Sequence, residues 1–308
     1  MAGNNGFAAG IGSANIDLLY SGLKRLPREG EELYAEDFSL QLGGGIPATL
    51  ITLARLGVKT KIATFLGDDI FSCFAREQFL KAGVSPFNIY GGHGIPVNVT
   101  SAMITKNDRT FVSYGRQSID ADDAALEKAY KMCSGAKVVI MHTGSFVPVY
   151  KKLKSEGTTL VFDCGWDDAL SFEKYGEYLE IADYYTPNQK EALKITGKNT
   201  PEDAADALSE YFEKVIVKLD KDGCLGLENG KRVYIPPVDN FKCVDSTGAG
   251  DAFLAGFIYG LYCGKSFTDS IMFGNITGGK CVTSVGCLSA YCTENELLQI
   301  HRDFYGGR

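Results

Sequence analysis

One stretch of nine residues, 245–253, carries the groups best suited to chemistry. It reads Asp-Ser-Thr-Gly-Ala-Gly-Asp-Ala-Phe, and Gly248 and Gly250 let backbone amides approach an anion closely because neither has a Cβ. The apolar run 252–258 predicts a buried helix, whose first turn offers free N–H groups and the positive end of the helix dipole to a phosphate. Asp251 stands in the same turn, where a carboxylate can take a proton from a hydroxyl or simply cap the helix.

Composition and charge exclude several classes of protein. The chain has 308 residues, 45% of them hydrophobic, so it can bury a large core. A formal net charge of −7 argues against a nucleic-acid partner. Nine cysteines without a CxxC pair favour a reducing, cytoplasmic location. Residues 1–12 lack a basic segment followed by an apolar run, and no apolar window reaches the roughly 18 residues of a membrane span, so we expect no signal peptide and no membrane partner.

The order of predicted elements indicates an α/β fold. From residue 121 onward, apolar runs alternate with amphipathic segments, as strands and helices do in a mostly parallel sheet. The predicted strands are 7–12, 137–142, 159–163, 181–187 and 214–220, and residues 61–69 are predicted as a strand followed by a turn. The predicted helices are 49–57, 71–81, 121–132, 252–262, 268–285 and 294–304.

Two segments before residue 121 are predicted to form short strands and a hairpin outside this alternating pattern. Short strands are predicted at 18–20 and 33–40, and a hairpin at 97–105 and 110–114. Arg109 lies at the hairpin turn, where it either reaches an anionic acceptor or, as we favour, is only solvated.

Polar side chains follow several of the predicted strands. Asn15 and Asp17 come after the first strand, His142 ends the strand at 137–142, and Trp166 follows the strand at 159–163. Ligands of parallel α/β sheets bind at the carboxyl ends of the strands, so we expect these residues to face one cleft. A surface turn for the first pair and a satisfied core position for His142 are the alternatives. The segment 10–15 lacks the third glycine of a dinucleotide fingerprint, which argues against a Rossmann dehydrogenase.

The nine-residue stretch resembles the C-terminal signature of ribokinase-like (PfkB-type) carbohydrate kinases. Gly43-Gly-Gly-Ile-Pro-Ala48 resembles the N-terminal signature of the same family, and Asn188-x-x-Glu191 lies between the two. The resemblance covers essentially the whole chain in order. It implies a ribokinase-like fold with a large, mostly parallel sheet flanked by helices and a small β-sheet lid.

The resemblance also assigns roles to residues at the acceptor site. It implies that Asp251 is the catalytic base and that Gly248, Ala249 and Gly250 form an anion hole. The resemblance places Asn15, Asp17, Gly44, Gly45 and Thr49 at the sugar. We add His142 and Trp166, which lie at strand ends, to the predicted acceptor site. Thr49 stands where the family usually has Asn, so we expect the acceptor or its pose to differ from ribose.

A second group of residues is implied for ATP and metal ions. Asn188 and Glu191 match the motif that organises Mg²⁺, although the same spacing is also a plain capping box. The nucleotide turn includes Lys218, Asp220 and Gly223, with Asp220 in place of a usual Gly, and Asn275 matches an adenine-edge residue. The residues that correspond to a monovalent-cation site, with K⁺ as a possible cofactor, are Asp245, Thr247, Cys281, Ser284 and Gly286.

These features predict one kinase chain, 1–308, that transfers the γ-phosphate of ATP to a hydroxymethyl group of a small carbohydrate. The lid is expected at about 16–42 and 95–116, and the nucleotide-binding part at about 186–308. Two alternatives remain, a nucleoside kinase of the same fold and a catalytically weak sugar-binding regulator suggested by Thr49 and Asp220. Open strand edges in the lid predict a homodimer.

Overall fold

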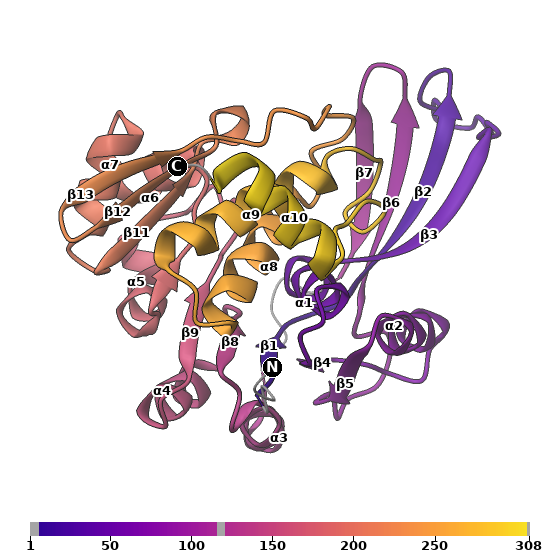
Figure 1. Ribbon diagram of the computed structural model, residues 1–308. Helices are drawn as coiled ribbons and strands as arrows, with labels where there is room; N and C mark the ends of the chain where they lie inside the picture. Colours follow the sequence, from indigo (N-terminus) through magenta and orange to yellow (C-terminus); the bar gives the residue numbers. More distant parts are fainter. Residues whose placement is uncertain (1–5, 116–120, 307–308) are drawn as a thin grey trace.

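The computed structural model describes residues 6–115 and 121–306. Its largest sheet has the strand order β10-β9-β8-β1-β4-β5, and every pairing in it is parallel. Its strands are β1 (Ala8–Ile11), β4 (Thr60–Thr64), β5 (Val84–Asn88), β8 (Val138–Met141), β9 (Thr159–Phe162) and β10 (Tyr184–Tyr185). Figure 1 shows this sheet in the middle of the molecule, with helices on both of its faces.

A three-stranded antiparallel sheet extends the structure beyond β10. It consists of β11 (Lys214–Lys218), β12 (Cys224–Glu228) and β13 (Lys231–Ile235). A single parallel bridge between Asn188 and Lys218 connects the exit of β10 to the end of β11. The carboxyl end of β11 therefore lies near the carboxyl ends of the parallel strands.

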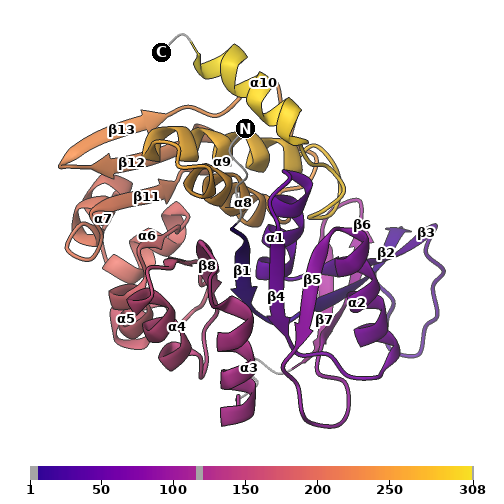
Figure 2. The same cartoon turned by 60° about the horizontal axis from the view of Figure 1, so that its bottom comes forward.

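A four-stranded sheet stands at one side of the molecule in both views (Figures 1 and 2). We call it the lid sheet, and its order is β3-β2-β6-β7. Its strands are β2 (Asn15–Leu23), β3 (Asp37–Gly43), β6 (Asn98–Thr105) and β7 (Arg109–Tyr114). The two predicted short-strand segments thus join into one sheet, with β2 and β6 parallel at its centre.

Helices cover both faces of the large sheet because successive side chains of its strands point to opposite faces. Ala8, Val138 and Ile140 belong to one core cluster, whereas their neighbours Ala9 and Val139 belong to another. The first cluster is closed by α1 (Gly45–Arg55), α2 (Ile70–Lys81), α8 (Ala249–Tyr262), α9 (Phe267–Cys281) and α10 (Glu294–Tyr305). The second is closed by α3 (Asp123–Cys133), α4 (Val147–Ser155), α5 (Phe172–Ile181), α6 (Gln189–Thr196) and α7 (Pro201–Leu208).

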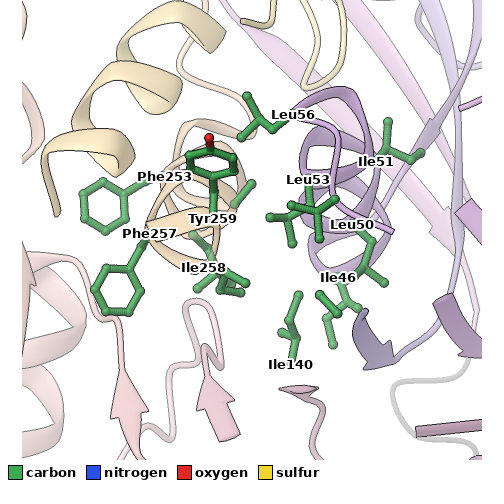
Figure 3. Packing of buried hydrophobic residues seen from close by; sticks show 14 of the residues in the cluster. Ile46, Leu50, Ile51, Leu53, Leu56, Ile140, Phe253, Phe257, Ile258 and Tyr259 are labelled. Atoms are coloured by element: carbon green, nitrogen blue, oxygen red, sulfur yellow. The ribbon is translucent and has the colours of Figure 1, made fainter. Parts of the chain in front are cut away.

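Helices α1 and α8 pack together at the centre of the first cluster (Figure 3). Leu50 and Leu53 of α1 and Phe257 and Ile258 of α8 are fully buried there. Helix α9 approaches α8 closely, because Gly256 and Gly260 leave no side chain between the two backbones. The first turns of α1 and α8 are thereby held against each other by rigid packing.

Several predicted boundaries were wrong. Helix α1 begins at Gly45 rather than residue 49, because Gly44 is its N-cap and Pro47 in the first turn needs no N–H partner. Strand β3 begins at Asp37 rather than residue 33. The strand predicted at 181–187 shrinks to the two residues of β10, since Ile181 still belongs to α5.

Two further differences concern the end of helix α9 and strand β5. Helix α9 ends at Cys281 instead of 285, because the carbonyl of Val282 turns to accept the amides of Val244 and Asp245. Strand β5 was not predicted; Pro86 weakened the strand pattern, but β5 lies at the sheet edge, where proline is tolerated. No helix among the described residues is both long and apolar enough to cross a membrane.

Candidate active site

The predicted anion site is formed by the first turn of α8. Gly248 is the N-cap residue with φ 77°, and a Cβ at this position would collide with Cys287, so only glycine fits there. The amides of Gly250 and Asp251 have no intrahelical acceptor at this helix start. The amide of Ala249 donates to the carbonyl of Ser246 at 3.2 Å, which closes the turn. The turn therefore presents free donors at the positive end of the helix.

Asp251 lies in this first turn beside the start of α1. A Cβ added to Gly45 would lie 3.1 Å from Asp251 Oδ1, so the missing side chain leaves the room that the carboxylate uses. Desolvation, together with the negative charge of Asp163, raises the pKa of Asp251 to about 7, although the ammonium group of Lys218 opposes the rise. A carboxyl group with a pKa near neutrality is suited to take and release a proton.

Lys218 brings a positive charge to the same place. Its Nζ lies 3.1 Å from Asp163 Oδ2, and a Cβ at Gly250 would lie 3.4 Å from this nitrogen. Burial disfavours the charged form of Lys218. The negative charges of Asp163 and Glu191 outweigh this effect, so the pKa of Lys218 is raised. Thr186 also donates to Asp163 Oδ2 at 3.0 Å, which orients the carboxylate toward the lysine. Lys218 is therefore a protonated group beside the predicted anion-binding turn, residues 248–251.

Asn188 and Glu191 form a complete capping box at the start of α6. Asn188 Oδ1 accepts the amide of Glu191 at 3.0 Å, and Glu191 Oε2 accepts the amide of Asn188 at 2.8 Å. The capping box and the predicted Mg²⁺ motif therefore use the same two residues, Asn188 and Glu191. Glu191 is buried, and burial together with Asp163 raises its pKa. A parallel bridge pairs Asn188 with Lys218, which places the capping box beside the ion pair of Lys218 and Asp163.

Polar side chains form a row across the inner face of the lid sheet. Strand pairing aligns Gln41, Asp17, Thr100 and Ser113, one from each strand. Thr100 Oγ1 lies 3.0 Å from Ser113 Oγ and donates to Asn15 Oδ1 at 3.2 Å, and Asn15 in turn donates to Asp17. Burial raises the pKa of Asp17. The Asp17 carboxylate lies against Gly43 and Asp251 Oδ1 lies beside Gly45, so the polar row and Asp251 meet at the start of α1.

Gly44 and Gly45 lie at the start of α1, between the lid sheet and α8. Gly44 is the N-cap of α1 with φ 97°, and Gly45 is its first residue. Thr49 is fully buried, and its hydroxyl contacts the carbonyls of Gly45 at 3.0 Å and Asp251 at 3.2 Å. The Thr49 hydroxyl thus connects α1 to the first turn of α8 instead of pointing into open space.

The family model for pfkB family carbohydrate kinases matches residues 7–294. This chain belongs to the pfkB family of carbohydrate kinases. It is a sugar kinase of that family, which favours an enzyme over the alternative of a binding regulator.

Its relatives are moderately distant. It is 25% identical over 283 residues to a 2-dehydro-3-deoxygluconokinase of Bacillus subtilis, covering 84% of this chain and 86% of the relative. The structure of Arabidopsis thaliana ribokinase complexed with ribose and ATP superposes with a TM-score of 0.81 at 24% identity, covering 96% of this chain and 98% of that chain. A Methanocaldococcus jannaschii nucleoside kinase has a TM-score of 0.75 at 18% identity, covering 96% and 98%. These superpositions confirm the predicted ribokinase-like fold.

His142 and Trp166 lie at the strand ends where they were predicted. His142 follows β8 and is partly buried, and this burial lowers the pKa of its imidazole. Its Nδ1 contacts the carbonyl of Thr143. Trp166 is 57% exposed in the loop after β9, and its Nε1 donates to Asp168 at 3.1 Å. Their contact with an acceptor stays a prediction.

The predicted nucleotide residues surround the turn between β11 and β12. Asp220 is one of two non-glycine residues with positive φ among the described residues, and φ 53° keeps the backbone conformation that glycine adopts freely. Its exposed carboxylate accepts from Gln189 at 2.9 Å. Gly223 has φ 88°, and the exit of β13 leaves no room for a Cβ there. Asn275 Nδ2 donates to the carbonyls of Ile235 and Pro236, both at 3.1 Å, so only its Oδ1 is left for a ligand.

The expectation that Arg109 is only solvated was wrong. Arg109 begins β7, and its Nη1 lies 3.1 Å from Asp245 Oδ1 and also contacts Thr247 Oγ1. Asp245 Oδ2 accepts the amide of Gly286 at 3.0 Å, and the Cys281 thiol donates to the carbonyl of Thr247 at 3.6 Å. Four of the five residues predicted around a monovalent cation are therefore neighbours, and Ser284 lies in the turn between Cys281 and Gly286.

Sequence reasoning missed some residues that the fold brings to the site. Gln41, Thr100 and Ser113 were not singled out, although the alternation of β6 and β7 would have placed Thr100 and Ser113 on one face. Thr186, which orients Asp163, also gave no signal because its role depends on a contact across 23 positions of the chain.

Proposed function

We propose that this protein transfers the γ-phosphate of ATP to a hydroxymethyl group of a small carbohydrate, with Asp251 as general base. The observation that carries the proposal is the position of Asp251 in the anion-binding turn of α8, where its pKa is raised to about 7. A base of this pKa is ionised in a large fraction of molecules near neutral pH and still accepts a proton readily.

The acceptor hydroxyl would approach Asp251 from the side of α1. As its oxygen attacks the γ-phosphorus, the bond from that phosphorus to the β-phosphate oxygen breaks and ADP leaves. Asp251 takes the hydroxyl proton, so no free alkoxide forms. The amides of the α8 turn and the ammonium group of Lys218 then stabilise the charge that spreads over the transferring phosphoryl oxygens. The proton is released from Asp251 to solvent after the phosphorylated product leaves.

The inner face of the lid sheet would hold the rest of the acceptor. The row Gln41, Asp17, Thr100 and Ser113, with Asn15 beside it, offers alternating donors and acceptors at the spacing of neighbouring strands. Such a row suits several hydroxyl groups of one sugar, because each hydroxyl both donates and accepts. The relatives named for sugar substrates support a carbohydrate acceptor.

Mg²⁺ fits the polar cluster around Glu191. Mg²⁺ keeps several of its waters and binds through one or two carboxylates together with substrate phosphates. Glu191 and Asp163 are the carboxylates that would hold it through water, and Asn188 fixes Glu191 by the capping box. Bound there, the ion would offset the negative charge of the phosphates.

A nucleoside acceptor is the second candidate, and Trp166 favours it. An aromatic ring that is 57% exposed at the carboxyl end of β9 can stack on a base, whereas a small sugar needs no such ring. The two candidates differ in which acceptor produces ADP.

The test is ADP release by the purified protein with Mg-ATP across sugars, sugar acids and nucleosides. We expect release that depends on a carbohydrate and falls by about 10²- to 10⁴-fold in Asp251→Ala, with the fold intact by circular dichroism. Asp303→Ala, an exposed acid on α10, is the matched control and should retain full activity. Turnover close to that of the unmodified protein in Asp251→Ala would overturn the mechanism, and release only with nucleosides would select the second candidate.

A further inference from the structure

An ion pair connects the lid sheet to the loop that leads into the anion-binding turn. Arg109, the first residue of β7, lies 136 positions before Asp245 in the chain, yet its Nη1 is 3.1 Å from Asp245 Oδ1. The same nitrogen contacts Thr247 Oγ1. In Figure 1 the loop between β13 and α8 extends across the top of the molecule toward β7. The guanidinium group therefore stands beside the segment that precedes Gly248.

Every oxygen of the Asp245 carboxylate has a donor. Oδ1 accepts the amide of Thr247 at 3.0 Å, its hydroxyl at 2.7 Å and the guanidinium of Arg109 at 3.1 Å. Oδ2 accepts the amide of Gly286 at 3.0 Å. The side chain of Asp245 is 13% exposed and that of Arg109 is 39% exposed, so the pair is open to solvent on the arginine side.

These contacts test whether a monovalent cation fits the residues that the family resemblance suggested for it. A cation there needs oxygen atoms that point to one place without a competing positive charge. The Cys281 thiol lies 3.6 Å from the carbonyl oxygen of Thr247 and 3.5 Å from that of Cys287, and its single hydrogen is donated to one of them at a time. The carboxylate of Asp245 is paired with Arg109, whose fixed positive charge repels a second cation. The residues present do not fit a resident K⁺.

We propose that Arg109 supplies the positive charge beside Asp245, so that this protein needs no monovalent cation. The guanidinium group cannot lose its proton in a protein and holds a planar array of donors, which makes it a permanent partner for the carboxylate and the Thr247 hydroxyl. Because Arg109 belongs to β7, it also fixes the lid sheet relative to the anion-binding turn. Only the expected effect of K⁺ on kcat/KM rests on the proposed kinase function.

The first experiment measures thermal stability and needs no turnover. The melting temperature is compared in KCl and in tetramethylammonium chloride at equal ionic strength of about 0.1 M, which separates specific binding from screening. We expect no K⁺-specific shift for the unmodified protein. Arg109→Ala exposes the carboxylate, so K⁺ should raise its melting temperature by about 2 °C or more through binding to the folded state.

Two control variants sharpen this comparison. Arg109→Lys keeps a positive charge and should show no K⁺-specific shift, as in the unmodified protein. Arg25→Ala removes another ion pair of the lid region and should behave in the same way, because the partner of Arg25 is Glu31 and not Asp245. A K⁺-specific shift in the unmodified protein, or none in Arg109→Ala, would overturn the proposal.

The second experiment measures kcat/KM with whichever acceptor the ADP assay identifies. The unmodified protein should differ by less than about twofold between the two salts, whereas Arg109→Ala should lose about tenfold without K⁺ and regain most of it with K⁺. Stimulation of the unmodified protein by about tenfold or more would contradict the proposal. If no acceptor supports turnover, the proposed function fails, and the thermal comparison still decides the role of Arg109.

Discussion

Lys218 Nζ lies 3.1 Å from Asp163 Oδ2, and the two residues stand at the carboxyl ends of strands from two different sheets. Asp163 follows β9 of the large sheet, whereas Lys218 ends β11 of the three-stranded sheet. Their side chains are 18% and 12% exposed, so the pair is largely shielded from water. The ammonium group is thereby held beside Gly250, at the point where a phosphate would meet the first turn of α8.

Replacing Lys218 should weaken both activity and stability. In Lys218→Met the anion-binding turn loses its neighbouring charge, and we expect kcat/KM to fall by about 10²-fold. The variant also leaves Asp163 unpaired, which should cost about 3 kcal/mol of the free energy of unfolding. Steady-state kinetics and urea unfolding measure the two effects. Lys218→Arg keeps the charge and should be closer to normal in both, and unchanged kcat/KM in Lys218→Met would contradict the role.

The rate should rise with pH through the pKa of Asp251. Asp251 acts as a base only when ionised, and desolvation raises its pKa to about 7. Below that pH most molecules carry a protonated Asp251, so kcat/KM for the acceptor should fall about tenfold per pH unit, and above it kcat/KM should level off. A pH profile of kcat/KM, which reports the free enzyme, measures this, with Asp303→Ala as a variant that should follow the same curve. A flat profile between about pH 6 and 8 would exclude Asp251 as the titrating base.

Gly248→Ala should damage the anion-binding turn without unfolding the protein. Its φ of 77° is strained for alanine, and the new Cβ would collide with Cys287. We expect a loss of about 1–3 kcal/mol in stability and a larger KM for Mg-ATP, because the turn must shift away from the phosphates. Gly230→Ala, at a hairpin turn with φ 72° and open space around it, has the same strain without the collision and should leave KM unchanged. Equal KM values in the two variants would argue against the role of the turn.

We propose that a second copy of this chain covers the outer face of the lid sheet. Tyr20, Phe38, Val112 and Tyr114 are 38%, 52%, 64% and 60% exposed there, and the edges β3 and β7 carry unpaired backbone groups. Sedimentation velocity should show a dimer, and Phe38→Glu should convert it to a monomer. Val233→Glu on β13, another exposed apolar position, is the control that should leave the dimer intact. A monomer at about 50 μM would contradict the interface.

Much of the site could be predicted because its motifs are local. The glycine turn at 248–250, the capping pair Asn188 and Glu191, and the start of α8 all depend on residues within a few positions of one another. Backbone conformation and helix capping are governed by such neighbours, so a sequence pattern is sufficient to predict them. The family resemblance supplied the roles of these motifs.

Contacts between distant segments could not be predicted in the same way. The sequence by itself determined the α/β class, the glycine turn at 248–250 and the position of Asp251 directly after it. Only the tertiary structure decided that Arg109 pairs with Asp245, that Lys218 pairs with Asp163 across 55 positions, and that four strands align one polar row. The physical reason is that ion pairs and strand register depend on how rigid elements pack, and packing is set by the whole buried core rather than by neighbouring residues.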